Sequence, residues 1–107
     1  MDSEFSKVKN IKECMETATV DANGEEEAAM GWQCCFEEVF EGVKKVKIFD
    51  EPVELVEFSL SQNSLVAICQ KGKKKAKVTL DSIGLIKPTK IQSLWLKAWL
   101  AWEGKGN

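Results

Sequence analysis

From the N-terminus to about residue 42, apolar residues recur at the spacing of an α-helix. The segment 1–16 predicts a short amphipathic helix that frays at its terminus, with an apolar face made of Phe5, Val8, Ile11 and Met15. The segment 17–21 is rich in β-prone residues and predicts a strand, which ends at the turn signal 21–24. A longer helix is predicted over 25–41 and ends at Gly42, because one face collects Ala29, Trp32, Phe36, Val39 and Phe40.

From residue 43 the apolar positions alternate with polar ones. This period of two predicts five short strands, at 43–49, 53–58, 65–70, 76–80 and 85–86, separated by tight polar connections. Five short strands with tight connections favour a small, curled antiparallel barrel. Closure of the sheet would protect strand edges that otherwise invite aggregation.

Helical spacing returns after Pro88 and Thr89. A broad apolar stripe follows, made of Ile91, Leu94, Trp95, Ala98, Trp99 and Trp102. A stripe of this width must be covered, so we expect the helix to plug or lid the barrel with its tryptophans in the core. The alternative is an exposed aromatic surface that binds a partner.

Length and composition fit one α+β domain spanning 1–107. The chain has 107 residues, of which 44% are apolar, enough for a single core. The net charge of -2 conceals an uneven distribution. Residues 1–60 hold 15 acids and 6 lysines, whereas residues 61–107 hold 2 acids and 9 lysines.

Missing residue types exclude several function classes. The chain has no histidine, which excludes Ser-His-Asp and Cys-His catalysis and zinc sites that contain histidine. It has no glycine-rich phosphate loop, and no nucleophile with an adjacent base is identifiable, so we predict a binding module rather than an enzyme. No apolar stretch reaches membrane-spanning length and no leader is apparent, which predicts the cytoplasm. Without CxxC spacing, Cys14, Cys34, Cys35 and Cys69 are expected to be buried or half-buried reduced thiols.

A cluster of acids at the start of the 25–41 helix is the main candidate for chemistry. Asp21, Asn23, Glu25, Glu26 and Glu27 lie within seven residues, and calcium takes six to eight oxygen ligands of these kinds. An EF-hand is excluded, since counting from Asp21 puts Glu26 at the glycine position and Trp32 at the glutamate position. The alternative is purely structural: Asn23 and Glu26 fit a capping box, and acids in a first helical turn are favoured by the helix dipole.

The segment 71–77 forms a second charged cluster, KGKKKAK, at a predicted hairpin tip. Such a tip attracts phosphates, but lysines there equally block strand addition at a sheet edge. The tip also lacks the aromatic residues on which single-stranded bases stack, so nucleic-acid binding is the weaker interpretation.

The segment 20–32, VDANGEEEAAMGW, resembles the signature of a family of small cyanobacterial-type calcium-binding proteins, the CcbP-like family. Segments 78–88 and 91–104 resemble the family's closing strand and C-terminal helix, so the resemblance covers most of 17–104. It implies a small SH3- or Sm-like antiparallel β-barrel with flanking helices, and calcium bound by acidic residues outside an EF-hand. The implied metal ligands are Asp21, Glu25, Glu26 and Glu27, with Asp21 and Glu25 as the leading pair.

The sequence therefore predicts a monomeric cytoplasmic calcium-binding protein, acting as a buffer or weak sensor, that also takes a protein partner and binds no membrane. The lysine hairpin is expected to weaken calcium binding if it lies near the acids. The alternative is a metal-free SH3/Sm-like barrel that binds a protein or nucleic acid through the 71–77 hairpin or the tryptophan-rich helix.

Overall fold

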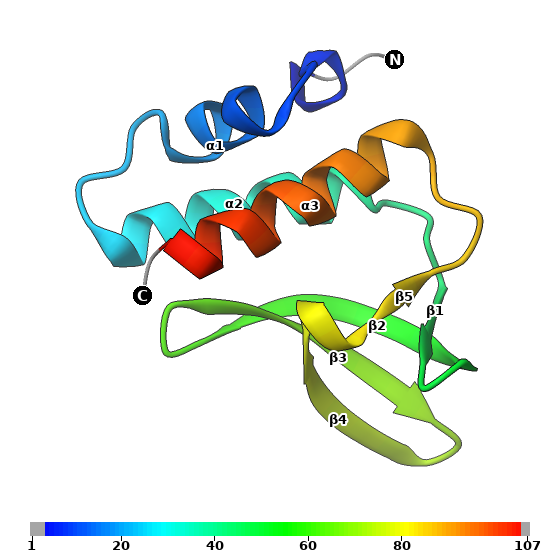
Figure 1. Ribbon diagram of the computed structural model, residues 1–107. Coiled ribbons are helices and arrows are strands. Elements are labelled where there is room, and N and C mark those ends of the chain that lie inside the picture. The colour runs from blue at the N-terminus through cyan, green and yellow to red at the C-terminus, as the bar shows by residue number, and fades with distance from the viewer. Residues whose placement is uncertain (1–3, 106–107) are drawn as a thin grey trace.

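Three layers make up the structure, a computed structural model that describes residues 4–105 (Figure 1). The outer layer is helix α1 (Ile11–Thr19), preceded by the short 3-10 helix η1 (Glu4–Lys7). The middle layer holds α2 (Glu25–Val39) and α3 (Lys90–Lys105), both of which contact α1. The third layer is an antiparallel sheet, whose strands β2 and β3 contact α2.

The N-terminal segment forms two helices instead of one helix and a strand. Asn10 ends the first piece and caps α1, because its Oδ1 accepts a 2.9 Å hydrogen bond from the Glu13 N–H. The strand predicted over 17–21 is wrong: α1 continues to Thr19 because Ala18, one turn after Cys14, is buried with it on the same face. The first three residues of the predicted 1–16 helix lie outside the described part of the chain.

Helix α2 occupies nearly the predicted range and crosses α1 at very close approach. A Cβ placed on Gly31 would lie 1.9 Å from the backbone oxygen of Ala18, so only glycine fits at this crossing. Gly42, at φ 87°, follows the helix and turns the chain toward the sheet, as the sequence indicated.

The five predicted strands are present, but they form an open sheet. They are β1 (Lys45–Ile48), β2 (Glu51–Ser61), β3 (Ser64–Lys71), β4 (Lys74–Thr79) and β5 (Gly84–Leu85), with the short 3-10 helix η2 (Leu80–Ser82) before β5. Their order is β4-β3-β2-β1-β5, so β4 and β5 are both edges within the described chain, and the predicted closure into an SH3/Sm-like barrel is wrong. Each edge has a feature that disfavours pairing with a strand of another molecule: β5 is only two residues long, and β4 carries exposed lysines.

Two-residue turns place the hairpin tips at opposite ends of the sheet. The β1–β2 turn consists of Phe49 and Asp50 (φ 51° and 63°), and the β2–β3 turn of Gln62 and Asn63 (φ 52° and 62°). Positive φ at both central residues is the pattern of a type I′ turn, which matches the twist of antiparallel strands. The β3–β4 turn has Gly72 first, at φ 61°. The β2–β3 tip lies at the end opposite to the other two tips (Figure 1).

The tryptophans of α3 form the core between the helices, as predicted. Trp95 and Trp99 are buried and pack edge-on against Trp32 of α2, with ring centroids 5.7 and 5.4 Å away. Thr89 caps α3: its Oγ1 accepts from the Gln92 N–H, and the Gln92 side chain accepts from the Thr89 N–H. Because the sheet is open, α3 lies beside α2 in a helical layer instead of plugging a barrel.

Candidate functional site

The four predicted metal ligands are all exposed at the start of α2. Asp21 lies in the connection from α1, and Glu25, Glu26 and Glu27 occupy the first turn of the helix. The predicted capping box of Asn23 and Glu26 is wrong by one residue, because Gly24 is the N-cap. Glu27 instead accepts a 3.1 Å hydrogen bond at its Oε2 from the N–H of Asn23, the residue before the N-cap.

Three of these acids line two different clefts on either side of α2. Asp21 and Glu27 line a cleft of about 340 Å³ between α1 and α2, together with Val20, Met30 and Cys34 among others. Glu25 lines a separate cleft of about 280 Å³ on the other side of the helix. The lining of neither cleft includes Glu26. The structure therefore separates Asp21 from Glu25, the pair that the sequence favoured as ligands.

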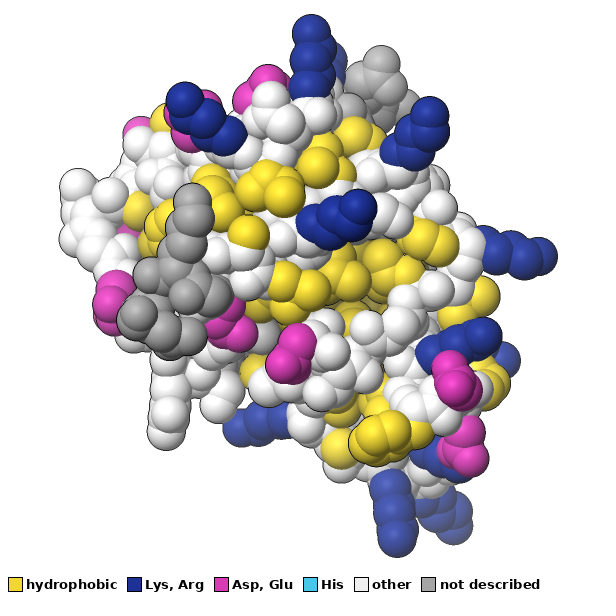
Figure 2. All heavy atoms as spheres, viewed as in Figure 1, with side chains coloured by type: hydrophobic (Ala, Val, Ile, Leu, Met, Phe, Trp, Pro, Cys, Tyr) yellow, Lys and Arg dark blue, Asp and Glu magenta, His cyan; other side chains and the backbone are white. Residues whose placement is uncertain are grey.

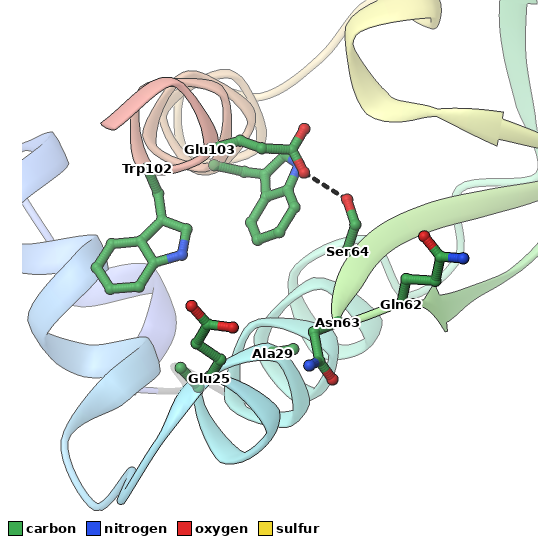
Figure 3. Close-up of a pocket in the computed structure, with 9 residues that line it drawn as sticks. Glu25, Ala29, Gln62, Asn63, Ser64, Trp102 and Glu103 are labelled. Carbon is green, nitrogen blue, oxygen red and sulfur yellow. Dashed lines mark hydrogen bonds between the residues drawn. The ribbon is translucent and has the colours of Figure 1, made fainter. Parts of the chain in front are cut away.

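The cleft at Glu25 brings together oxygen-bearing side chains from three elements (Figure 3). Glu25 comes from the first turn of α2 and Glu103 from the last turns of α3, and the β2–β3 tip supplies Gln62, Asn63 and Ser64. The carboxylate of Glu103 accepts a hydrogen bond from the Ser64 hydroxyl, which joins α3 to the sheet. We call this group of five residues the oxygen-lined cleft.

Tryptophan residues form the apolar wall of the oxygen-lined cleft. Trp102 is half-buried, whereas Trp99 is only 2% exposed, and its indole Nε1 is buried without a hydrogen-bond partner among the described residues. A buried N–H group is costly unless an acceptor oxygen satisfies it.

The donor set fits a hard cation, although its charge is low. Carboxylate, amide and hydroxyl oxygens are the ligands of calcium, and this cleft offers all three kinds. Within residues 4–105, however, no three acids, histidines or cysteines gather closely enough to hold a metal ion. Two carboxylates would leave much of a calcium shell to neutral oxygens and water, and a low charge count gives weak affinity.

Sequence analysis identified only Glu25 among the five residues of this cleft and missed the other four, Gln62, Asn63, Ser64 and Glu103. Glu103 is one of two acids in the basic C-terminal part, and Ser64 belongs to an ordinary hairpin tip. Only the packing of α3 against the sheet brings them beside Glu25, and nothing in the local sequence signals that contact.

The lysine hairpin lies far from the oxygen-lined cleft. Strand β3 begins with Ser64 at the cleft and reaches Lys71 seven residues later. At about 3.4 Å per residue, the two ends of this strand are roughly 24 Å apart. The Debye length in physiological salt is about 8 Å, so the lysines are screened from the cleft. The predicted weakening of calcium binding by a nearby hairpin therefore has no structural basis.

At the lysine end of the sheet, one ion pair joins two neighbouring strands. Lys71 donates to the carboxylate of Glu51, and both side chains are well exposed. This hydrogen bond, with the accompanying charge attraction, lowers the pKa of Glu51 below its usual value. The other lysines of the 71–77 segment are exposed as well, so the predicted hairpin tip is present and solvated.

The thiol prediction holds for three of the four cysteines. Cys14, Cys35 and Cys69 are buried, but Cys34 is exposed, at the cleft between α1 and α2. Burial raises the pKa of Cys69. Burial and then the charge of Glu13 raise the pKa of Cys14 to about 11. No helix in the described part of the chain is long and apolar enough to cross a membrane.

Two solved structures share this fold over nearly the full chain. One is CcbP from Anabaena, with a TM-score of 0.73 and 20% sequence identity, covering 94% of this chain and 97% of the other. The second is a calcium binding protein in its calcium-binding form, with a TM-score of 0.73 and 18% identity, covering 98% of each chain. No protein-family model and no curated protein sequence matches this chain. The resemblance to CcbP-like proteins is thus confirmed at the level of the fold.

Proposed function

We propose that this protein binds calcium as a member of the CcbP-like group, as a buffer or weak sensor in the cytoplasm. The strongest support is the shared fold with a calcium binding protein in its calcium-binding form, matched over 98% of both chains. The acidic segment 20–32 resembles the signature of the same group. No arrangement of catalytic groups was identified from the sequence, which favours a binding function over an enzymatic one.

The oxygen-lined cleft supports a specific set of ligands. We assign the leading roles to Glu25 and Glu103, with the Ser64 hydroxyl hydrogen-bonded to Glu103. Asn63 also lines the cleft, but its amide points away from Ser64 and Glu103 (Figure 3). The C-terminal end of α3 contributes a partial negative charge near Glu103, which favours a cation there. Glu25 was among the predicted ligands, and it shares its cleft with Glu103, an acid that lies 78 residues later in the chain.

The other predicted ligands, Asp21, Glu26 and Glu27, remain candidates for a second or alternative site. Asp21 and Glu27 share the cleft between α1 and α2, but Glu27 already accepts a hydrogen bond from the backbone. We therefore expect this pair to contribute less than Glu25 and Glu103.

Calorimetric titration with calcium, together with tryptophan fluorescence, tests the proposal. Trp99 and Trp102 line the cleft, so calcium should change the emission along one saturable curve. The double variant Glu25→Gln/Glu103→Gln should lose most of the affinity while keeping side-chain size. Glu37→Gln/Glu38→Gln, which removes two exposed acids farther along α2, is the matched control and should bind normally.

Three outcomes of these titrations would count against the proposal or its ligands. No saturable response at millimolar calcium would overturn the proposed function. If the Glu25/Glu103 variant kept its calcium affinity while Asp21→Asn/Glu27→Gln lost it, the calcium site would lie in the cleft between α1 and α2. If the control variant lost as much calcium affinity, the loss would reflect the overall negative charge of the surface and not these two ligands.

The alternative function, partner binding through the tryptophan-rich helix, has little support. Trp95 and Trp99 are buried and Trp102 is half-buried, so α3 presents no continuous aromatic surface. The lysine hairpin, by contrast, is fully exposed to a partner.

A further inference from the structure

The end of the sheet opposite the oxygen-lined cleft gathers two hairpin tips. The β1–β2 tip consists of Phe49 and Asp50, and the β3–β4 tip of Gly72 and Lys73. Strands β2 and β3 pair side by side, and the Glu51–Lys71 ion pair joins them where they reach these tips. Both tips therefore point from the same end of the molecule, although they lie more than twenty residues apart in the sequence (Figure 1).

Phe49 is the most exposed large apolar residue described. Its side chain is 96% exposed, and its φ of 51° places it in the left-handed region. The first central position of such a turn favours Asn, Asp or Gly, and a phenylalanine here has neither packing nor backbone preference in its favour. Strained positions of this kind are found most often where a side chain has a role in binding.

At the end of the sheet that carries Phe49, exposed lysines outnumber exposed acids. Seven exposed lysines lie on the strands and turns of this end, against four exposed acids, Asp50, Glu51, Glu54 and Glu57, and Glu51 is paired with Lys71. Figure 2 shows lysine side chains projecting from the lower right of the molecule beside apolar surface and a few acids. We call this surface the basic sheet end; its members are Phe49 and the lysines Lys45, Lys47, Lys71, Lys73, Lys74, Lys75 and Lys77.

We propose that the basic sheet end docks this protein on an anionic phospholipid bilayer. A protruding apolar side chain at the same end of the sheet as several exposed lysines matches a flat, negatively charged surface that is apolar just beneath its headgroups. Phe49 enters the boundary between headgroups and acyl chains, and the lysines stay at the phosphates. The sequence predicted that the protein binds no membrane because no apolar stretch is long enough to span one, but docking by a hairpin tip needs no such stretch.

Single-stranded nucleic acid fits this surface less well. Such ligands take a groove along which successive bases stack on several aromatic side chains. Among the exposed large apolar residues of the described chain, Phe49 is the only aromatic one, and it stands at a projecting turn. The lysines are point charges without the bidentate geometry of arginine, which suits a fluid array of headgroups.

Vesicle co-sedimentation in the presence of a calcium chelator tests the proposal independently of calcium binding. The full chain should sediment with vesicles of phosphatidylcholine mixed with phosphatidylserine, should not sediment with phosphatidylcholine alone, and should be released by salt. Lys73→Gln/Lys74→Gln/Lys75→Gln should lower the partition coefficient by about a hundredfold, since each lysine contributes about fivefold. Phe49→Asn should lower it by about tenfold.

The variants separate docking from folding and from overall charge. Asparagine suits the turn at position 49, so Phe49→Asn keeps the fold while removing the apolar tip. Lys12→Gln/Lys90→Gln/Lys97→Gln removes three exposed lysines from the helices and should leave sedimentation with phosphatidylserine vesicles unchanged. Absence of binding to these vesicles, equal loss in that control, or preferential binding of a single-stranded oligonucleotide in competition would overturn the proposal.

Discussion

At the scale of single residues, the positive-φ turn at Phe49 makes a stability prediction that is separate from docking. Phenylalanine is disfavoured in the left-handed region, whereas asparagine tolerates it. Because the Phe49 side chain is almost fully exposed, Phe49→Asn removes almost no buried apolar surface. We expect Phe49→Asn to raise the free energy of unfolding by about 1 kcal/mol. Urea unfolding followed by tryptophan emission measures it.

A strand position provides the control for this change. Val56 is also an exposed apolar residue, but it lies within β2, where asparagine is disfavoured. Val56→Asn should therefore destabilise or leave the unfolding midpoint unchanged. A lower midpoint for Phe49→Asn would mean that the phenylalanine makes stabilising contacts in solution.

The cysteines give a second prediction at this scale. Cys34 is exposed, whereas Cys14, Cys35 and Cys69 are buried, and burial with the nearby charge of Glu13 raises the pKa of Cys14 to about 11. Thiolate is the reactive form, so a buried thiol with a raised pKa reacts slowly near neutral pH. A thiol-specific chromophore should label one site per native chain quickly, and Cys34→Ser should abolish that fast phase. Fast labelling of two or more thiols would contradict the packing around the helices.

At the scale of elements, the crossing of α1 and α2 depends on Gly31. Alanine in a helix interior normally stabilises by up to about 1 kcal/mol relative to glycine. Here the added Cβ would lie 1.9 Å from the backbone oxygen of Ala18, so the helices must separate. We expect Gly31→Ala to destabilise by about 1–3 kcal/mol, the usual cost of overpacking.

The sign of the Gly31 effect is diagnostic. Met30→Ala alters the exposed neighbour on the same helix and should change the unfolding free energy by less than about 0.5 kcal/mol. If Gly31→Ala were stabilising, helix propensity would outweigh the contact and α1 would not lie so close to α2. Gly31, within the segment 20–32, thus has a packing role, and Trp32 beside it is part of the core.

The elements also show where prediction from sequence works and where it stops. Helix α2 and the five strands were predictable because periodicity is local: Trp32 and Phe36 repeat at helical spacing, and alternation marks each strand. The strand prediction for 17–21 was wrong because Ala18 is buried by a contact with Gly31, which no local pattern reports. Barrel closure failed because it depends on pairing between distant edges, and β5 pairs with β1 instead of β4.

The candidate site follows the same division. Glu25 was predictable from the acidic cluster, but Glu103 and Ser64 join it only through the packing of α3 on the sheet. Phe49 was predicted as the last residue of the strand over 43–49, but β1 ends at Ile48 and Phe49 lies in the turn. Its nearness to the lysine hairpin depends on strand pairing, which no local pattern reports.

At the scale of the whole molecule, the uneven charge of the sequence becomes a separation in space. The oxygen-lined cleft lies at one end of β3 and the basic sheet end at the other, with most of the strand between them. At roughly 24 Å, about three Debye lengths in physiological salt, the lysines act on the cleft only weakly. The two proposed sites should therefore operate independently of each other.

This independence can be measured directly. Lys73→Gln/Lys74→Gln/Lys75→Gln should change the calcium dissociation constant by less than about twofold at physiological salt, because screening removes most of the repulsion. Glu25→Gln/Glu103→Gln, measured in the same calorimeter, should weaken calcium binding strongly while leaving sedimentation with phosphatidylserine vesicles unaltered. A marked tightening of calcium binding in the lysine variant would place the cation near the hairpin, and the acids of the cleft would then not be its ligands.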